Sequence, residues 1–151
     1  MVPTVADRKV KVCNRIVTCR HARVTYPFPV MNPANLFTHE TNLINLAPGQ
    51  TLFKAGDPGD VMFILLEGTL DIIVGDTVVE KAERGAIVGE MALIDQTPRV
   101  ATVIARSECR FAKIDQRRFF SIIHLNPFFA THVMKTLADR LRQTNQLLSQ
   151  K

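Results

Sequence analysis

Short apolar segments alternate with turn residues along the middle of the chain, from residue 43 to residue 114. Each segment holds four to six residues and is rich in β-branched and aromatic side chains, which is typical of β-strands. Gly75-Asp76, between two of the segments, predicts the tight turn of a hairpin. Many short strands separated by turns predict a mainly β sandwich or barrel. The segments are LINLA, TLFK, VMFILL, TLDIIV, TVVE, VATVIA and CRFAKI.

After Ile114 the spacing of apolar residues changes from two to about 3.6, the period of an α-helix. Asp115 is suited to cap a first helix, and Asn126-Pro127 predicts the start of a second, longer one that runs to about Leu148. The second helix carries a seam of residues spaced three and four apart. The seam suits packing on the β domain or on the same helix of a second copy, as in a homodimer. Its members are Met134, Leu137, Leu141, Thr144 and Leu148.

The chain has 151 residues, of which 46% are hydrophobic, enough for one domain with a core. Its formal net charge of +5 is concentrated in residues 1–25, where six basic residues face Asp7 alone. The rest of the chain contains 13 basic and 13 acidic residues. Because the domain itself is neutral, we expect no direct binding of nucleic acid by this chain.

Residues 1–30 and residues 31–151 differ in character. The first part is basic, lacks a regular period and ends among prolines, so we expect a disordered extension. A start codon placed too early, with Met31 as the true first residue, and an organelle transit peptide are open alternatives. We expect residues 31–151 to form the functional domain.

Cysteine usage and hydropathy bear on the compartment. Cys13, Cys19 and Cys109 are odd in number and form no CxxC pair, so neither a disulfide framework nor a zinc site is predicted. No apolar run approaches the about 18 residues that a membrane span needs. We therefore expect a cytoplasmic protein in a reducing environment, without membrane contact.

The histidines bear on the possibility of an enzyme. A metal-dependent enzyme on a β-barrel scaffold requires closely spaced histidines and a carboxylate as ligands. The histidines here are scattered, and no general base, nucleophile or metal site emerges from the sequence. We expect no catalysis and no metal. The histidines are His21, His39, His124 and His132.

The run GEMALIDQTPRVATV, residues 89–103, interrupts the strand pattern with one short helical turn. Gly89 lets the backbone approach a ligand, and the free N–H groups of a helical turn bind anions. Arg99 supplies a planar fork suited to phosphate oxygens, and Glu90 is an acceptor for a sugar hydroxyl. A purely structural interpretation is also open, in which Gly89 ends a strand and Arg99 lies in solvent.

This run, extended by one residue to VGEMALIDQTPRVATV, resembles the phosphate-binding cassette of the cyclic nucleotide-binding domain family. The run GDPGDVMFILLEGTLDI resembles the strand-turn-strand signature of that family, and the two terminal helices resemble its lid helices. The resemblance covers about Asn32 to Leu148. Within the family, the chain is similar to the regulatory domains of the catabolite activator protein and of cyclic-AMP-dependent protein kinase. It implies a mainly β, eight-stranded jelly roll (double-stranded β-helix) with a short N-terminal helix, a cassette helix and two C-terminal helices.

The resemblance also implies a set of binding residues. Glu90 would bind the ribose 2′-hydroxyl, Arg99 the cyclic phosphate, and the amides of Gly89 and Ala92 would help to hold the phosphate. The family often has phenylalanine before the glycine, where this chain has Val88. The remaining cassette positions in the expected site are Met91, Val100 and Ala101.

Two positions bear on which nucleotide binds. Members selective for cyclic GMP often have threonine after the arginine, whereas this chain has Val100, which favours cyclic AMP over cyclic GMP. The last helix resembles that of the catabolite activator protein, where a Thr-Ser pair approaches the adenine. Thr144 and Asn145 occupy those places here, and the alternative that both are ordinary exposed helix residues is open.

The sequence therefore predicts a cyclic nucleotide sensor whose C-terminal helices pass occupancy to a protein effector that the sequence does not identify. One alternative is a fragment of a larger transcription regulator or channel, since only three residues follow Leu148 and leave no room for a DNA-reading motif. Another alternative is a degenerate member that has lost its ligand. The presence of both Glu90 and Arg99 weighs against it.

Overall fold

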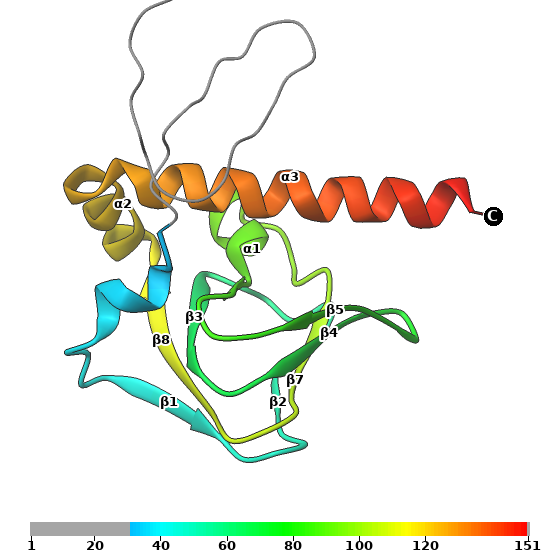
Figure 1. Ribbon diagram of the computed structural model, residues 1–151, viewed down its shortest axis with the longest axis horizontal. Helices are drawn as coiled ribbons and strands as arrows, with labels where there is room; N and C mark the ends of the chain where they lie inside the picture. The colour runs from blue at the N-terminus through cyan, green and yellow to red at the C-terminus, as the bar shows by residue number, and fades with distance from the viewer. Residues whose placement is uncertain (1–30, 151) are drawn as a thin grey trace, which may run out of the picture. The chain divides into compact units, whose positions relative to one another are not determined.

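The computed structural model describes residues 31–150, where eight strands form two antiparallel four-stranded sheets (Figure 1). The strands are β1 (Leu43–Leu46), β2 (Thr51–Phe53), β3 (Val61–Glu67), β4 (Leu70–Val74), β5 (Thr77–Ala82), β6 (Ile87–Val88), β7 (Thr102–Ala105) and β8 (Cys109–Asp115). The helices are the 3₁₀-helix η1 (Pro33–Phe37) and the α-helices α1 (Glu90–Asp95), α2 (Gln116–Leu125) and α3 (Pro127–Ser149). The predicted mainly β class and strand count are confirmed.

Strands that are far apart in the sequence pair with one another. The order is β1-β8-β3-β6 in one sheet and β2-β7-β4-β5 in the other, so that Leu43 of β1 lies opposite Ala112 of β8. The hairpin predicted at Gly75-Asp76 is confirmed. Val74 and Thr77 pair across the turn, and Gly75 has a φ of 60°. A residue with a side chain rarely adopts that conformation.

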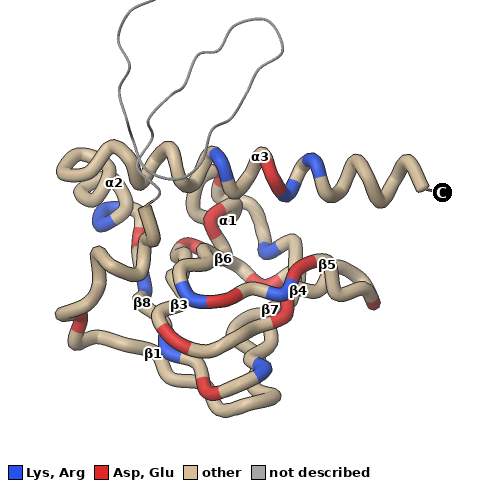
Figure 2. Tube along the Cα trace, viewed as in Figure 1, with Lys and Arg blue, Asp and Glu red and all other residues tan. Residues whose placement is uncertain are grey.

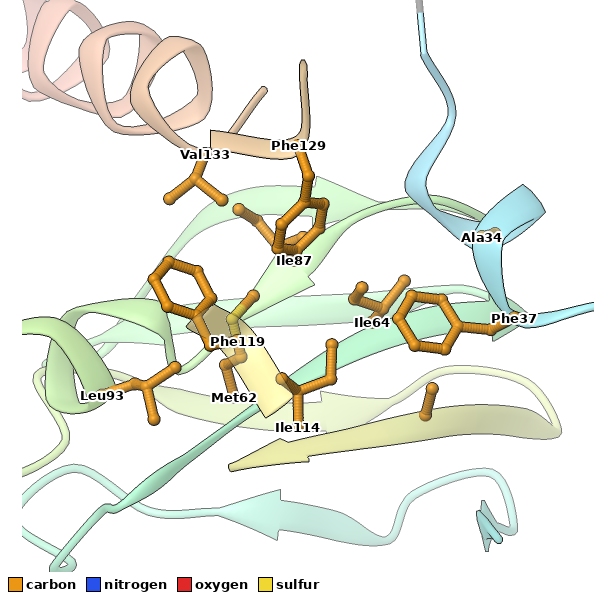
Figure 3. Packing of buried hydrophobic residues seen from close by; sticks show 11 residues of the cluster. Ala34, Phe37, Met62, Ile64, Ile87, Leu93, Ile114, Phe119, Phe129 and Val133 are labelled. Carbon is orange, nitrogen blue, oxygen red and sulfur yellow. The ribbon is translucent and has the colours of Figure 1, made fainter. Parts of the chain in front are cut away.

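The core has two parts, because β3 is buried on both faces. Met62 and Ile64 point toward the helices, whereas Phe63 and Leu65 point between the two sheets. In Figure 3, Phe129 from α3 and Phe119 from α2 converge on the helix side of this strand. Their rings pack edge to face, with centroids 6.0 Å apart. The first turn of α3 is thereby fixed to the sheet.

The two C-terminal helices begin where the sequence predicts. The Asp115 side chain accepts a hydrogen bond from the Arg118 backbone N–H at 2.8 Å and caps α2, and Pro127 stands at the start of α3. The predicted seam on α3 is divided. Leu137 packs against the core, but Met134, Leu141 and Leu148 are 61%, 62% and 65% exposed. These three are not covered by the described part of the chain.

Several expectations concern residues outside the described range. The proposed extension, residues 1–30, lies there, as do Cys13, Cys19 and His21. Within the described range, Cys109 is buried and unpaired, and neither a metal-ligand cluster nor a helix fit to cross a membrane is found. Figure 2 shows acidic and basic positions interspersed along the strands and α3 of this range.

Candidate functional site

Gly89 connects β6 to α1 and takes a conformation that needs glycine. Its φ of 77° and ψ of 11° are left-handed, and an added Cβ would collide with Nη1 of Arg99. The glycine therefore does two things: it turns the chain into the short helix and it leaves space for the arginine side chain. This explains in structural terms why a glycine stands at this point of the cassette.

Arg99 is only 6% exposed, so the interpretation that places it in solvent is wrong. Its Nη1 donates to the carbonyl of Gly89 at 2.9 Å, and its guanidinium lies 4.4 Å from the centroid of the Phe53 ring. On another side lies Gly59, where a Cβ would come within 2.6 Å of the Arg99 Cζ atom. Two glycines and an aromatic ring thus hold the guanidinium in a fixed place.

The buried positive charge of Arg99 is only partly compensated by the acidic side chains around it. Burial lowers the pKa of the guanidinium, and the carboxylates of Asp60, Asp57 and Glu90 offset this only in part. The group remains charged at neutral pH because the guanidinium is the most basic of the protein side chains. Its Nε is buried and has no hydrogen-bond partner within residues 31–150. A buried donor of this kind is costly unless a ligand or water accepts from it.

Glu90, the first residue of α1, is 2% exposed. One oxygen, Oε1, accepts from Nη1 of Arg140 on α3 at 2.7 Å. The other, Oε2, is buried without a partner in the described structure. The carboxylate is thus neutralised by a cation and still keeps one oxygen able to accept a hydrogen bond.

Arg140 joins α3 to the strands below it, and sequence analysis did not identify it. Its Nε donates to Glu80 on β5 at 2.8 Å, and its Nη2 donates to the carbonyl of Ile87 at 2.9 Å. Burial acts to lower the pKa of Arg140, but the carboxylates of Glu90 and Glu80 outweigh it and the pKa is raised. Arg140 lies four residues before Thr144, so both lie on the same side of α3, and this spacing is the feature of the local sequence that points to Arg140 as a site residue.

A cavity lies between the cassette, β4, β5 and α3. Apolar side chains such as Phe53, Ile72 and Val79 form most of its wall. The charged groups are two carboxylates, Glu80 and Glu90, and two guanidiniums, Arg99 and Arg140. A mainly apolar pocket with a few converging polar groups is typical of a small-molecule site.

The structure brings nine of the ten expected site residues to this cavity. Thr144 is among them, although its hydroxyl donates to the carbonyl of Arg140 at 3.0 Å. Asn145 is not, because each residue of an α-helix is rotated by about 100° from the one before. Gln143 and Leu147 of α3 line the cavity instead. The nine are Val88, Gly89, Glu90, Met91, Ala92, Arg99, Val100, Ala101 and Thr144.

The family assignment rests on a match to the sequence model described as "Cyclic nucleotide-binding domain", which spans residues 43–126. That span is more than half of the chain and runs from β1 through α2. The chain belongs to the cyclic nucleotide-binding domain family. It is therefore a regulatory domain of the signal-transduction class.

Relatives of several kinds share this domain. A cGMP-dependent protein kinase of Plasmodium berghei (strain Anka) is 38% identical over 80 residues, which are 53% of this chain and 9% of the kinase. The cAMP-activated global transcriptional regulator CRP of Pasteurella multocida (strain Pm70) is 29% identical over 105 residues, 66% of this chain and 50% of the regulator. The chain thus spans at most half the length of these two relatives. The kinase similarity covers too little of that protein to include its whole activity.

Among solved structures, a cyclic nucleotide-binding domain from Methylobacillus flagellatus has a similar fold. The TM-score is 0.64 at 24% sequence identity, over 72% of this chain and 67% of that one. At this identity the similarity concerns the fold. It agrees with two antiparallel sheets of four strands and with helices at the C-terminal end.

Proposed function

We propose that the chain binds a cyclic nucleotide, with cyclic AMP preferred, and that occupancy changes the seating of α2 and α3. One observation carries the proposal. Arg99 Nε is a buried donor and Glu90 Oε2 a buried acceptor, neither has a partner in the described range, and both residues line one cavity. A ligand that carries both an anionic phosphate and a sugar hydroxyl offers an acceptor to the first atom and a donor to the second.

In this proposal Arg99 binds the cyclic phosphate and Glu90 accepts from the ribose 2′-hydroxyl. The backbone amides of Gly89 and Ala92 contribute to the phosphate site, and the apolar cassette residues Val88, Met91, Val100 and Ala101 enclose the sugar.

We further interpret the two sheets as the predicted jelly roll. The order β1-β8-β3-β6 and β2-β7-β4-β5 supports this, because it alternates early and late strands as paired Greek keys do.

Calorimetric titration of the full chain with cyclic AMP and with cyclic GMP tests the proposal. We expect tighter binding of cyclic AMP, because Val100 offers no hydroxyl to a guanine. At one hundred times its dissociation constant the ligand adds about 2.7 kcal/mol to the free energy of unfolding, so the melting temperature rises. If millimolar nucleotide gives no heat of binding and no thermal shift, the chain is a degenerate member that has lost its ligand. Formation of 5′-AMP would indicate an enzyme.

Thr144 and Asn145 form a matched pair for locating the base. If the base lies at the α3 side of the cavity, replacing Thr144 with valine, which has nearly the same shape, should weaken cyclic AMP binding. A net hydrogen bond is worth about 0.5–1.5 kcal/mol, so the expected loss is about two- to tenfold. Asn145→Ala should bind like the parent, because Asn145 does not line the cavity. Equal affinity in both variants, measured by calorimetry, would place the base elsewhere.

The exposed residues of α3 support a second proposal, that two copies pair through this helix. Met134, Leu141 and Leu148 are all more than 60% exposed and lie on a stripe with the spacing of a two-helix seam. Leu141→Lys would place a charge in that seam and should give monomers that remain folded. Sedimentation equilibrium of both proteins decides this, and a monomeric parent would contradict the proposal.

A further inference from the structure

Arg140 divides its hydrogen-bond donors among three acceptors. Nη1 donates to Glu90 at 2.7 Å and Nε to Oε2 of Glu80 at 2.8 Å, while Nη2 donates both to the carbonyl of Ile87 at 2.9 Å and to Oε1 of Glu80 at 3.5 Å. A guanidinium frequently pairs with a carboxylate through two parallel N–H bonds to both oxygens. Here Glu90 receives only one of the two bonds. The consequence is the partnerless Oε2, buried in a residue that is 2% exposed.

Glu80 is the charged group that holds the other donors of Arg140, since it accepts from both Nε and Nη2, and the carbonyl of Ile87 also accepts from Nη2. Glu80 lies on β5 and lines the same cavity as the cassette, and its side chain is about as exposed as that of Arg140, at 24% and 23%. The guanidinium therefore lies between two carboxylates and is attracted by both, as the raised pKa of Arg140 also indicates. Without Glu80, the neutral carbonyl of Ile87 is left to hold Nη2 of Arg140 away from Glu90.

We infer that Glu80 is a positioning residue: by holding one edge of the Arg140 fork, it keeps Oε2 of Glu90 open to accept from a ligand hydroxyl. The inference rests on the proposed function, since it needs the ribose 2′-hydroxyl at Glu90. It assigns a task to a cavity-lining residue that acts on Glu90 through Arg140. It also explains how a buried carboxylate is charge-compensated and still free to bind.

The effect of losing Glu80 follows from this geometry. In Glu80→Gln the amide has no charge to attract the guanidinium, so the fork turns toward Glu90 and engages both of its oxygens. A ligand hydroxyl must then compete with a charged donor for Oε2. The loss is specific to the 2′-hydroxyl, because a ligand that lacks this group does not use Oε2.

The experiment compares the dissociation constants of cyclic AMP and 2′-deoxy cyclic AMP for the parent chain and Glu80→Gln. A hydrogen bond to a charged group is worth about 1.5–3 kcal/mol, so the parent should prefer cyclic AMP by about 10- to 150-fold. In Glu80→Gln we expect the preference to fall to about threefold or less. Glu83→Gln is the matched control, since Glu83 is exposed, follows the same strand and does not line the cavity. It should keep the parent ratio.

Two further results separate the inference from the proposed function. If the parent binds neither nucleotide, the proposed function and the inference both fail. If the parent discriminates and Glu80→Gln discriminates equally, the inference alone is overturned. Arg140→Gln tests whether Glu80 acts through Arg140. If it does, adding Glu80→Gln to Arg140→Gln should not change the preference for cyclic AMP over 2′-deoxy cyclic AMP any further. An additive loss in the double variant would overturn the inference, and circular dichroism checks that each variant is folded.

Discussion

Replacing Arg99 with alanine is expected to weaken cyclic AMP binding by about 2–5 kcal/mol, a factor of about 30 to several thousand. The side chain is buried against Phe53 and fixed to the carbonyl of Gly89, so its geometry is set before the ligand arrives. Removing it leaves the phosphate in a mainly apolar cavity without its cation. Calorimetric titration of the variant measures the loss.

Two companion variants show whether charge or geometry matters at this site. Arg99→Lys keeps the charge but not the two-donor fork, so its affinity should lie between those of the parent and Arg99→Ala. Arg110→Ala removes an arginine whose side chain is 48% exposed and which pairs with Glu67 on the surface. It should bind like the parent. Parent-like affinity in Arg99→Ala would contradict the assignment of the phosphate site.

The parts of the fold that the sequence predicts correctly are those that depend on neighbouring residues. The Asp115 cap and the Gly75-Asp76 hairpin each depend on a few adjacent residues and on a backbone preference. The cassette is likewise continuous in the sequence, so its residues arrive at the cavity together. β6, with only two residues, is too short to give a periodic signal of its own.

The parts that the sequence did not reveal depend on distant residues. Arg140 contacts Glu90 across 50 positions and Glu80 across 60, and no spacing rule connects such pairs. The burial of Arg99 depends in the same way on Gly59, forty positions earlier, which leaves the necessary space. Asn145 shows the opposite case, because a similar position in a relative does not determine which side of the helix faces the cavity.

The helix that carries Arg140 depends on a separate packing contact at its start. Phe129 is 0% exposed and packs against Phe119, in the core between α2, α3 and the sheet (Figure 3). Eleven residues, or about 16 Å of helix, separate it from Arg140. Most of α3 beyond Leu141 is exposed, so this core and the Arg140 bonds hold the helix to the strands. We therefore expect the orientation of Arg140 to depend on the packing of Phe129.

Phe129→Ala is expected to lower the free energy of unfolding by about 3–5 kcal/mol, because it removes a fully buried ring and leaves a cavity. Phe120→Ala is the matched control: Phe120 is 61% exposed on α2, and its loss should change stability by about 0.5 kcal/mol or less. Urea denaturation of the three proteins gives both values.

We also expect Phe129→Ala, where still folded, to bind cyclic AMP more weakly than Phe120→Ala, since α3 then no longer holds Arg140 firmly against Glu90. Equal stabilities of the two variants would mean that α3 is held by contacts other than this core. Unequal stabilities with equal affinities would mean that the Arg140 bonds alone position the helix over the site.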